Sequence, residues 1–183
     1  MKIFLFSMLS LLLFVSCHDI KKQDQLKKMD VLTSTVSVIS ENLNAIDSAK
    51  MELIWNEIKV VRKTIQANYH DDTLSTTLGQ DLEDYNLAGK QALWVDENLP
   101  IARKTVIEIQ TRLTQLQKDI QTGNGEREKY NSYIEIEEKQ VNELKVFQES
   151  LLKNSLEANA KYQELNNKIL NYSKQLTLKN RTL

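Results

Sequence analysis

Apolar residues recur every three or four positions over most of this chain, which is the spacing of one face of an α-helix. In the first such stretch, from Asp30 to about Gln66, the apolar positions are Leu32, Val36, Ile39, Leu43, Ile46, Ile54, Ile58, Val61 and Ile65. Two successive steps of four around Lys50 resemble a stutter in a coiled-coil seam. The pattern predicts one long helix over residues 30–66.

A polar segment from Asn68 to Thr73 ends this stretch and is rich in helix-capping residues, so we predict a chain reversal at 69–73. Apolar periodicity then resumes at Leu74, Leu78, Leu82, Tyr85, Ala88, Ala92, Leu93 and Val95, and again at Ala102, Val106, Ile109, Leu113, Leu116 and Ile120. Pro100 lies between these two sets, where it removes a backbone donor and disfavours helical geometry in the preceding residue. Because no glycine or long polar cluster accompanies Pro100, we predict a kink within one arm; the alternative is a reversal.

The clearest stop is the segment from Gln121 to Gly125, whose glycines can adopt the left-handed conformation that closes a helix. The helix predicted after it has heptad periodicity. One series of positions seven apart is Ile134, Val141, Gln148, Ser155, Tyr162, Ile169 and Leu176, and a companion series is Tyr130, Glu137, Leu144, Leu151, Ala158, Leu165 and Tyr172. We expect these two series to form the buried seam of the last helix.

The predicted arms match in length. At about 1.5 Å of rise per residue, residues 28–68, 74–121 and 127–178 would span roughly 60, 70 and 78 Å. The chain has only 4 glycines and 1 proline in 183 residues, so it has few places to turn. We therefore predict an all-α fold, an elongated antiparallel helical bundle or coiled coil of three long arms with the middle arm kinked near Pro100. A four-helix bundle, with a reversal at Pro100, is the alternative.

The N-terminus differs from the rest, because Met1-Lys2 is followed by an uncharged apolar run from Ile3 to Val15. This run is shorter than a membrane-spanning helix and is typical of a secretory signal. Phe14-Val15-Ser16-Cys17 resembles the lipobox of bacterial lipoproteins, with Phe14 where leucine is commoner. The resemblance implies cleavage before Cys17, diacylglycerol on its thiol and a further acyl chain, such as palmitate, on the new amino terminus. A plain secretory signal with an incidental cysteine is the alternative.

These features divide the chain into a signal peptide (1–16), a lipidated N-terminus and tether (17–29), a helical bundle domain (30–178) and a C-terminal tail (179–183). Cys17 is the only cysteine, so no disulfide is available. Cleavage removes one lysine and leaves the mature chain nearly neutral, which disfavours nucleic-acid binding. His18, rather than aspartate, after Cys17 resembles outer-membrane sorting in enterobacteria. We expect a lipid anchor in the cell envelope, on the periplasmic side of the outer membrane.

Candidate catalytic and metal-binding groups are few. His70-Asp71-Asp72 holds metal-ligand residue types, but a zinc or iron site needs three or four fixed ligands, and helix capping is the preferred interpretation. The acidic groups Asp81-Glu83-Asp84 and Glu135-Glu137-Glu138 are expected on solvated helix faces. Gly123-Asn124-Gly125 lacks the context of a phosphate loop. We predict no catalytic, metal or cofactor site, and no enzyme activity.

The remaining signals concern surfaces. Gly79 and Gly89 either allow close helix approach or simply weaken the helix. The aromatic residues are expected in the core or along a groove; these are Trp55, Trp94, Tyr85, Tyr130, Tyr133, Tyr162 and Tyr172. Leu113-Thr114-Gln115-Leu116-Gln117 is similar to the Leu-Thr-x-x-Gln element of Spy/CpxP-type periplasmic chaperones and stress sensors, which carry two copies.

We therefore predict a non-catalytic structural or protein-interaction module, with a protein partner or self-association through its helices. A Spy/CpxP-like chaperone or stress-sensing domain is the alternative. The helix from Tyr130 to Leu176 is the expected binding surface, because Gln148 and Ser155 interrupt its apolar seam. The alternative is that these two positions are tolerated at a solvated edge of the bundle. Phe147 and Tyr133 are expected on its free flank.

Overall fold

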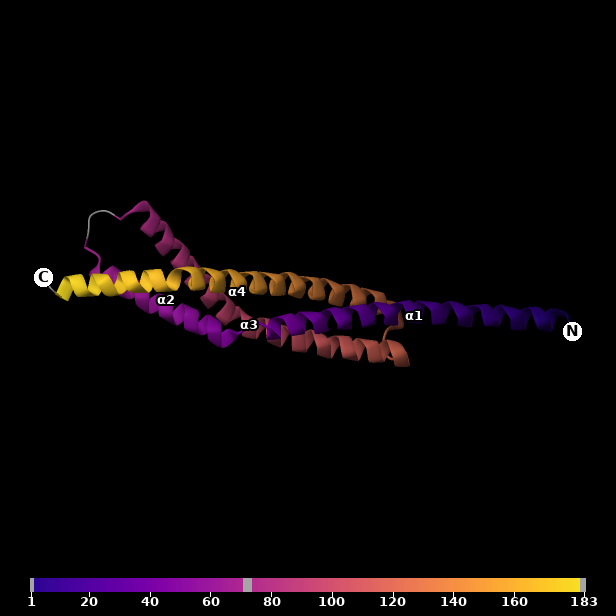
Figure 1. Ribbon diagram of the computed structural model, residues 1–183. Coiled ribbons are helices and arrows are strands. Elements are labelled where there is room, and N and C mark those ends of the chain that lie inside the picture. Colours follow the sequence, from indigo (N-terminus) through magenta and orange to yellow (C-terminus); the bar gives the residue numbers. More distant parts are fainter. Residues whose placement is uncertain (1, 71–73, 182–183) are drawn as a thin grey trace. The chain divides into compact units, whose positions relative to one another are not determined.

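A computed structural model describes residues 2–70 and 74–181, with side chains for residues 20–70 and 74–180. The described chain is all-α, as predicted, and comprises α1 (Lys2–Asn44), α2 (Ser48–Asn68), α3 (Thr76–Thr122), a short 3₁₀ helix η1 (Arg127–Lys129) and α4 (Tyr130–Arg181) (Figure 1). The side chains of Cys17 and His18, and the residues Asp71 and Asp72, lie outside this description. No helix in the described part of the chain is long and apolar enough to cross a membrane.

The first predicted helix is two helices, α1 and α2, so the expectation of one continuous helix over 30–66 is wrong. Asp47 starts α2 as its N-cap, with its side chain accepting a 3.0 Å hydrogen bond from the Lys50 amide. At the break, the Arg103 guanidinium of α3 donates to the carbonyls of Leu43 (3.0 Å) and Ile46 (3.3 Å), and the Leu43 carbonyl also accepts from the Ile46 amide. A local cap and a cation on another helix thus stabilise the break.

Pro100 lies inside α3, which continues from Thr76 to Thr122. The chain therefore does not reverse at this proline, and the alternative of a reversal there is wrong. The proline is exposed while its neighbour Leu99 is fully buried, so the helix keeps its apolar side in the core at this point. A kink at Pro100 stays a prediction.

The helix α3 ends at the glycine-containing segment, as the sequence predicts. Gly123 and Gly125 have φ angles of 72° and 81°, in the left-handed region that favours glycine. The amides of Gly123 and Asn124 both donate to the Asp119 carbonyl, at 2.7 and 3.0 Å. The Tyr130 hydroxyl also donates to the Asp119 carbonyl, at 2.9 Å, and thereby joins the start of α4 to the end of α3.

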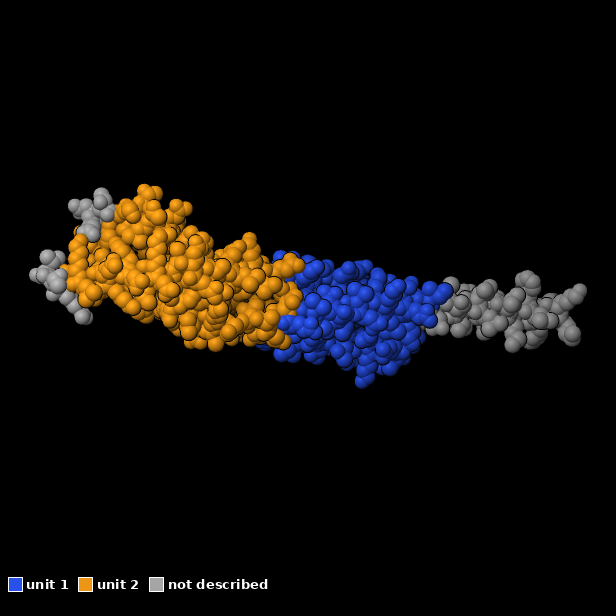
Figure 2. All heavy atoms as spheres, viewed as in Figure 1, with its two compact units in different colours: residues 1–41, 104–146 blue, residues 42–103, 147–183 orange. Residues whose placement is uncertain are grey.

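The chain divides into two compact units, coloured separately in Figure 2. Unit 1 comprises residues 1–41 and 104–146, and polar contacts join its three helical segments in every pair. Gln25 of α1 donates to Asn131 of α4 (2.7 Å), Gln117 of α3 donates to Asp30 of α1 (2.8 Å), and Arg112 of α3 pairs with Glu137 of α4 (2.8 Å). Gln25 and Met29 are buried, so residues 20–29, expected as a tether, belong to this bundle.

Unit 2 comprises residues 42–103 and 147–183, and combines α2 with the first part of α3 and the second part of α4. Gly89 brings α3 close to α2, because a Cβ at this position would lie 2.8 Å from Ile58 Cγ2. The predicted role of Gly89 in close helix approach is confirmed. Polar contacts join both of these helices to α4, which continues to Arg181, beyond the expected end at 178.

The buried seam of α4 coincides with the two predicted heptad series. All fourteen positions are buried except Tyr162 and Tyr172, which are half-buried. Gln148 and Ser155 are themselves buried, and the Ser155 hydroxyl donates to the Leu152 carbonyl at 2.8 Å. These polar positions are therefore used inside the protein's own bundle and do not form a free edge.

Candidate functional site

The most connected polar group in unit 2 joins all three of its helices. The Tyr85 hydroxyl of α3 donates to Asn166 Oδ1 of α4 at 2.6 Å. Asn166 Nδ2 donates to the Tyr162 hydroxyl oxygen at 3.0 Å, and the Tyr162 hydroxyl donates to the Glu57 carboxylate of α2. Because each of these residues has a partner on another helix or one turn away, the group specifies how the helices align.

Both hydroxyls in this network hold their protons. Burial raises the pKa of Tyr85, and the neighbouring Tyr162 and Glu57 raise it further. Burial and the hydrogen bond to Glu57 raise the pKa of Tyr162 to about 12. At neutral pH neither oxygen is available as a base or nucleophile, so the arrangement suits structural alignment better than proton transfer.

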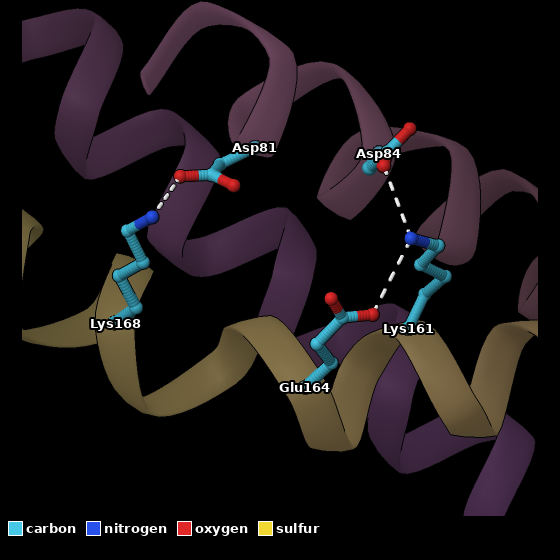
Figure 3. A network of polar contacts seen from close by, with 5 residues as sticks. All are labelled: Asp81, Asp84, Lys161, Glu164 and Lys168. Atoms are coloured by element: carbon cyan, nitrogen blue, oxygen red, sulfur yellow. Dashed lines mark hydrogen bonds and ion pairs between the residues drawn. The ribbon is translucent and has the colours of Figure 1, made fainter. Parts of the chain in front are cut away.

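A second group of polar contacts lies along α3 and α4, shown in Figure 3. Lys161 of α4 lies between Asp84 of α3 (3.2 Å) and Glu164 of its own helix (3.3 Å), and Lys168 pairs with Asp81. Hydrogen bonds to Asp84 and Glu164 raise the pKa of Lys161. Glu83 is exposed, as expected for a solvated face, whereas Asp81 and Asp84 are half-buried and pair with lysines of a neighbouring helix.

The three glutamates near the start of α4 differ in their exposure to solvent. Glu135 and Glu138 are exposed as expected, whereas Glu137 is buried and accepts a 2.8 Å hydrogen bond from Arg112 Nε of α3. The same guanidinium donates to Gln140. The expected solvated face is therefore wrong for Glu137, and the companion heptad series predicts its burial correctly.

The histidine cluster brings no ligands together within the described chain. His70 is exposed, and Asp71 and Asp72 lie outside the described residues. No group of three or more histidine, cysteine, aspartate or glutamate side chains could hold a metal ion in the described part of the chain.

The aromatic residues separate into core and groove positions. Trp94 and Phe147 pack edge to face, with ring centroids 6.1 Å apart and an interplanar angle of 84°. Phe147 is therefore a packing residue, and its expected place on a free flank is wrong. Tyr133 is exposed, as expected. Trp55 is half-buried on α2, with Lys59 Nζ 5.6 Å from its ring centroid.

The segment similar to the Leu-Thr-x-x-Gln element is used within unit 1. Leu113 is fully buried, and the Thr114 hydroxyl donates to the Gln110 carbonyl at 2.8 Å. Gln115 donates to Asp119 of the same helix (2.9 Å), while Gln117 donates to Asp30 of α1. These contacts give the segment an ordinary structural role.

No family model matches this chain, and neither curated proteins nor solved structures include a match to it.

Proposed function

We propose that this chain is a lipid-anchored protein of the bacterial cell envelope whose helical units bind another protein and catalyse no reaction. The observation that carries the proposal is the mutual pairing of polar groups between the helices of unit 2. Asn166 joins the hydroxyls of Tyr85 and Tyr162 by hydrogen bonds, and the Tyr162 hydroxyl donates to the Glu57 carboxylate. Lysines of α4 form ion pairs with carboxylates of α3. Groups engaged in this way stabilise a scaffold and are unsuited to acid–base chemistry.

The proposed anchor rests on the resemblance of Phe14-Val15-Ser16-Cys17 to a lipobox and on the burial of α1 soon after it. The part of α1 up to Glu41 belongs to unit 1, and side chains on one of its faces are buried from Gln25 onward. An acylated Cys17 would hold this unit close to the membrane surface, with little free linker between them. The proposed site is the periplasmic face of the outer membrane.

A Spy/CpxP-like chaperone has less support. The one motif that resembles that family contributes Leu113 to the core and Gln117 to a contact with α1, so it is occupied within unit 1.

The anchor is tested with Cys17→Ser, which removes the acylated thiol. We expect this variant to leave the membrane fraction of cells, whereas Ser16→Ala, which keeps a small residue before the cysteine, should remain membrane-bound. Retention of Cys17→Ser in membranes with normal signal removal would contradict the lipid anchor.

The interaction role is tested by placing a photo-crosslinking amino acid at exposed positions of α2, α3 and α4 in intact cells. We expect a discrete crosslinked product from at least one contiguous surface. The absence of a product from every exposed position would contradict the binding role.

A further inference from the structure

A row of side chains lies along one edge of α2, beside α3. Trp55, Lys59, Arg62 and Gln66 stand at i, i+4, i+7 and i+11, which places them on one side of the helix. With Lys63, and with Asn86 of α3 opposite, they line a groove of about 200 Å³ over the buried Ile58. We call this feature the α2–α3 groove.

The α2–α3 groove is cationic. Its described lining contains Lys59, Arg62 and Lys63, all exposed, and no carboxylate. Lys59 lies over the Trp55 ring. Arg62 and Lys63 have no side-chain hydrogen bond or ion pair to any described residue, whereas Lys161 and Lys168 on α4 are both paired.

No ion pair joins these three cations to a described carboxylate. Glu83 lines a second hollow along α3, and Asn86 lines both. Asp84 is bound to Lys161, and Glu57 accepts from Tyr162. Within residues 20–70 and 74–180, the groove therefore presents three cations that no carboxylate pairs, beside an aromatic ring.

We propose that the α2–α3 groove binds an acidic, extended segment of a partner protein. This inference rests on the proposed interaction role and names its site and the chemistry of the partner. The spacing of the cations fits such a segment. Lys59 and Lys63 are about 6 Å apart along the helix axis, and alternate side chains of an extended strand are separated by roughly 6.6 Å.

Each lining group has a part in this recognition. Arg62 can bind a carboxylate with two parallel hydrogen bonds, while the lysines act as point charges. The Trp55 ring and the aliphatic stems of Lys59 and Arg62 offer apolar contact to the residues between the acids. A nucleic acid fits less well, because its phosphates call for a longer basic stripe than three side chains on a nearly neutral protein.

The test uses the full chain in detergent micelles and a short fluorescein-labelled peptide of alternating glutamate and alanine, with fluorescence anisotropy measured at low salt. We expect saturable binding that Arg62→Gln/Lys63→Gln weakens about tenfold, since two cations facing carboxylates are lost. The matched control is Lys153→Gln/Lys174→Gln, which removes the same charge from exposed positions of α4 in the same unit. Its affinity should stay within about twofold of the original chain. Thermal unfolding monitored by circular dichroism should be alike for both variants.

Three results with the glutamate peptide would overturn the inference. These are no saturable binding of the glutamate peptide, equal weakening in the two double variants, and displacement of the peptide by inorganic phosphate at equal concentration. The last result would indicate a site for small anions. A peptide of alternating lysine and alanine should not bind, and binding of it would equally contradict the inference.

The inference can fail separately from the proposed function. A photo-crosslinker at Gln66 should be captured by the partner in intact cells. Capture from other exposed positions but never from Gln66 would overturn the groove alone, whereas capture from no position would overturn the interaction role.

Discussion

Tyr162 on α4 donates its hydroxyl proton to the Glu57 carboxylate on α2, across 105 positions of sequence. This contact depends on the hydroxyl keeping its proton, because a phenolate would lose the donor and face a carboxylate of like charge. Unit 2 thus has a polar contact whose strength depends on pH in the alkaline range.

The first prediction concerns this pH dependence. The Tyr162 pKa is about 12 in the folded chain against 10.0 for an unperturbed tyrosine, so its contribution is complete below pH 10 and is lost as the pH rises toward 12. The free energy of unfolding should fall over this range, and the fall should be about 1 kcal/mol smaller in Tyr162→Phe, because solvent screens the interaction of the partly exposed hydroxyl. The measurement is urea unfolding monitored by circular dichroism at several alkaline pH values. Tyr133→Phe, at an exposed tyrosine, should leave the fall unchanged, and an equal effect of both variants would contradict the assignment.

The second prediction compares two glycines of α3. Gly89→Ala should destabilise the chain by about 1–3 kcal/mol despite the better helix propensity of alanine, because its Cβ would lie 2.8 Å from Ile58 Cγ2. Gly79→Ala places a Cβ 3.3 Å from the end of the Leu74 side chain, which is exposed and able to move. This second variant should be neutral or stabilising by up to about 1 kcal/mol. Chemical denaturation of both variants checks the pair, and a stabilising Gly89→Ala would show that α2 and α3 are not in close contact there.

The third prediction concerns the Arg112–Glu137 pair of unit 1. Arg112→Ala should cost about 1–3 kcal/mol, because it leaves the buried carboxylate without its cation; the exposure of Arg112 keeps the figure below that of a fully buried pair. Glu137→Leu should be neutral or stabilising, since residue 137 is a heptad core position. The double variant Arg112→Ala/Glu137→Leu should recover the stability lost by the single arginine change. Non-recovery in urea unfolding would mean that Arg112 acts through another contact.

The fourth prediction tests the seam of α4 itself. Leu151 is fully buried, so Leu151→Ala should lower the unfolding free energy by about 2–5 kcal/mol. Leu156, on the same helix, is 61% exposed, and its replacement by alanine should change stability by less than about 0.5 kcal/mol. Similar losses from the two changes in thermal or chemical unfolding would contradict the assigned seam.

Periodicity predicted most of the buried positions, although Leu74, which belongs to the predicted pattern, is 40% exposed. Ile58, Leu113 and Leu151 obey single-helix spacing, and that spacing does not depend on which neighbour covers the face. The break before α2 was missed because Ile46 and Ile54 keep an acceptable spacing across it, although the cap Asp47 was a usable signal.

The contacts of the candidate site could not be predicted from periodicity, because they depend on how the helices pack against one another. The contacts of Asp81 with Lys168 and of Phe147 with Trp94 require knowing which sides of α3 and α4 face each other. A single helix pattern does not contain that relation. The row from Trp55 to Gln66 was visible as a spacing, but its opposite wall at Asn86 depends on the packing of α2 on α3.

Each compact unit is assembled from segments that lie far apart in the chain. Gln25 meets Asn131 across 106 positions in unit 1, much as Glu57 meets Tyr162 in unit 2. During synthesis, α1 and α2 would leave the ribosome long before the parts of α4 that cover them, and they would wait with apolar faces exposed. We expect a chaperone to cover these apolar faces until α4 has been synthesised. Truncation within α4 should remove one helix from the packing of each unit, so a stop codon there would be as harmful as one much earlier.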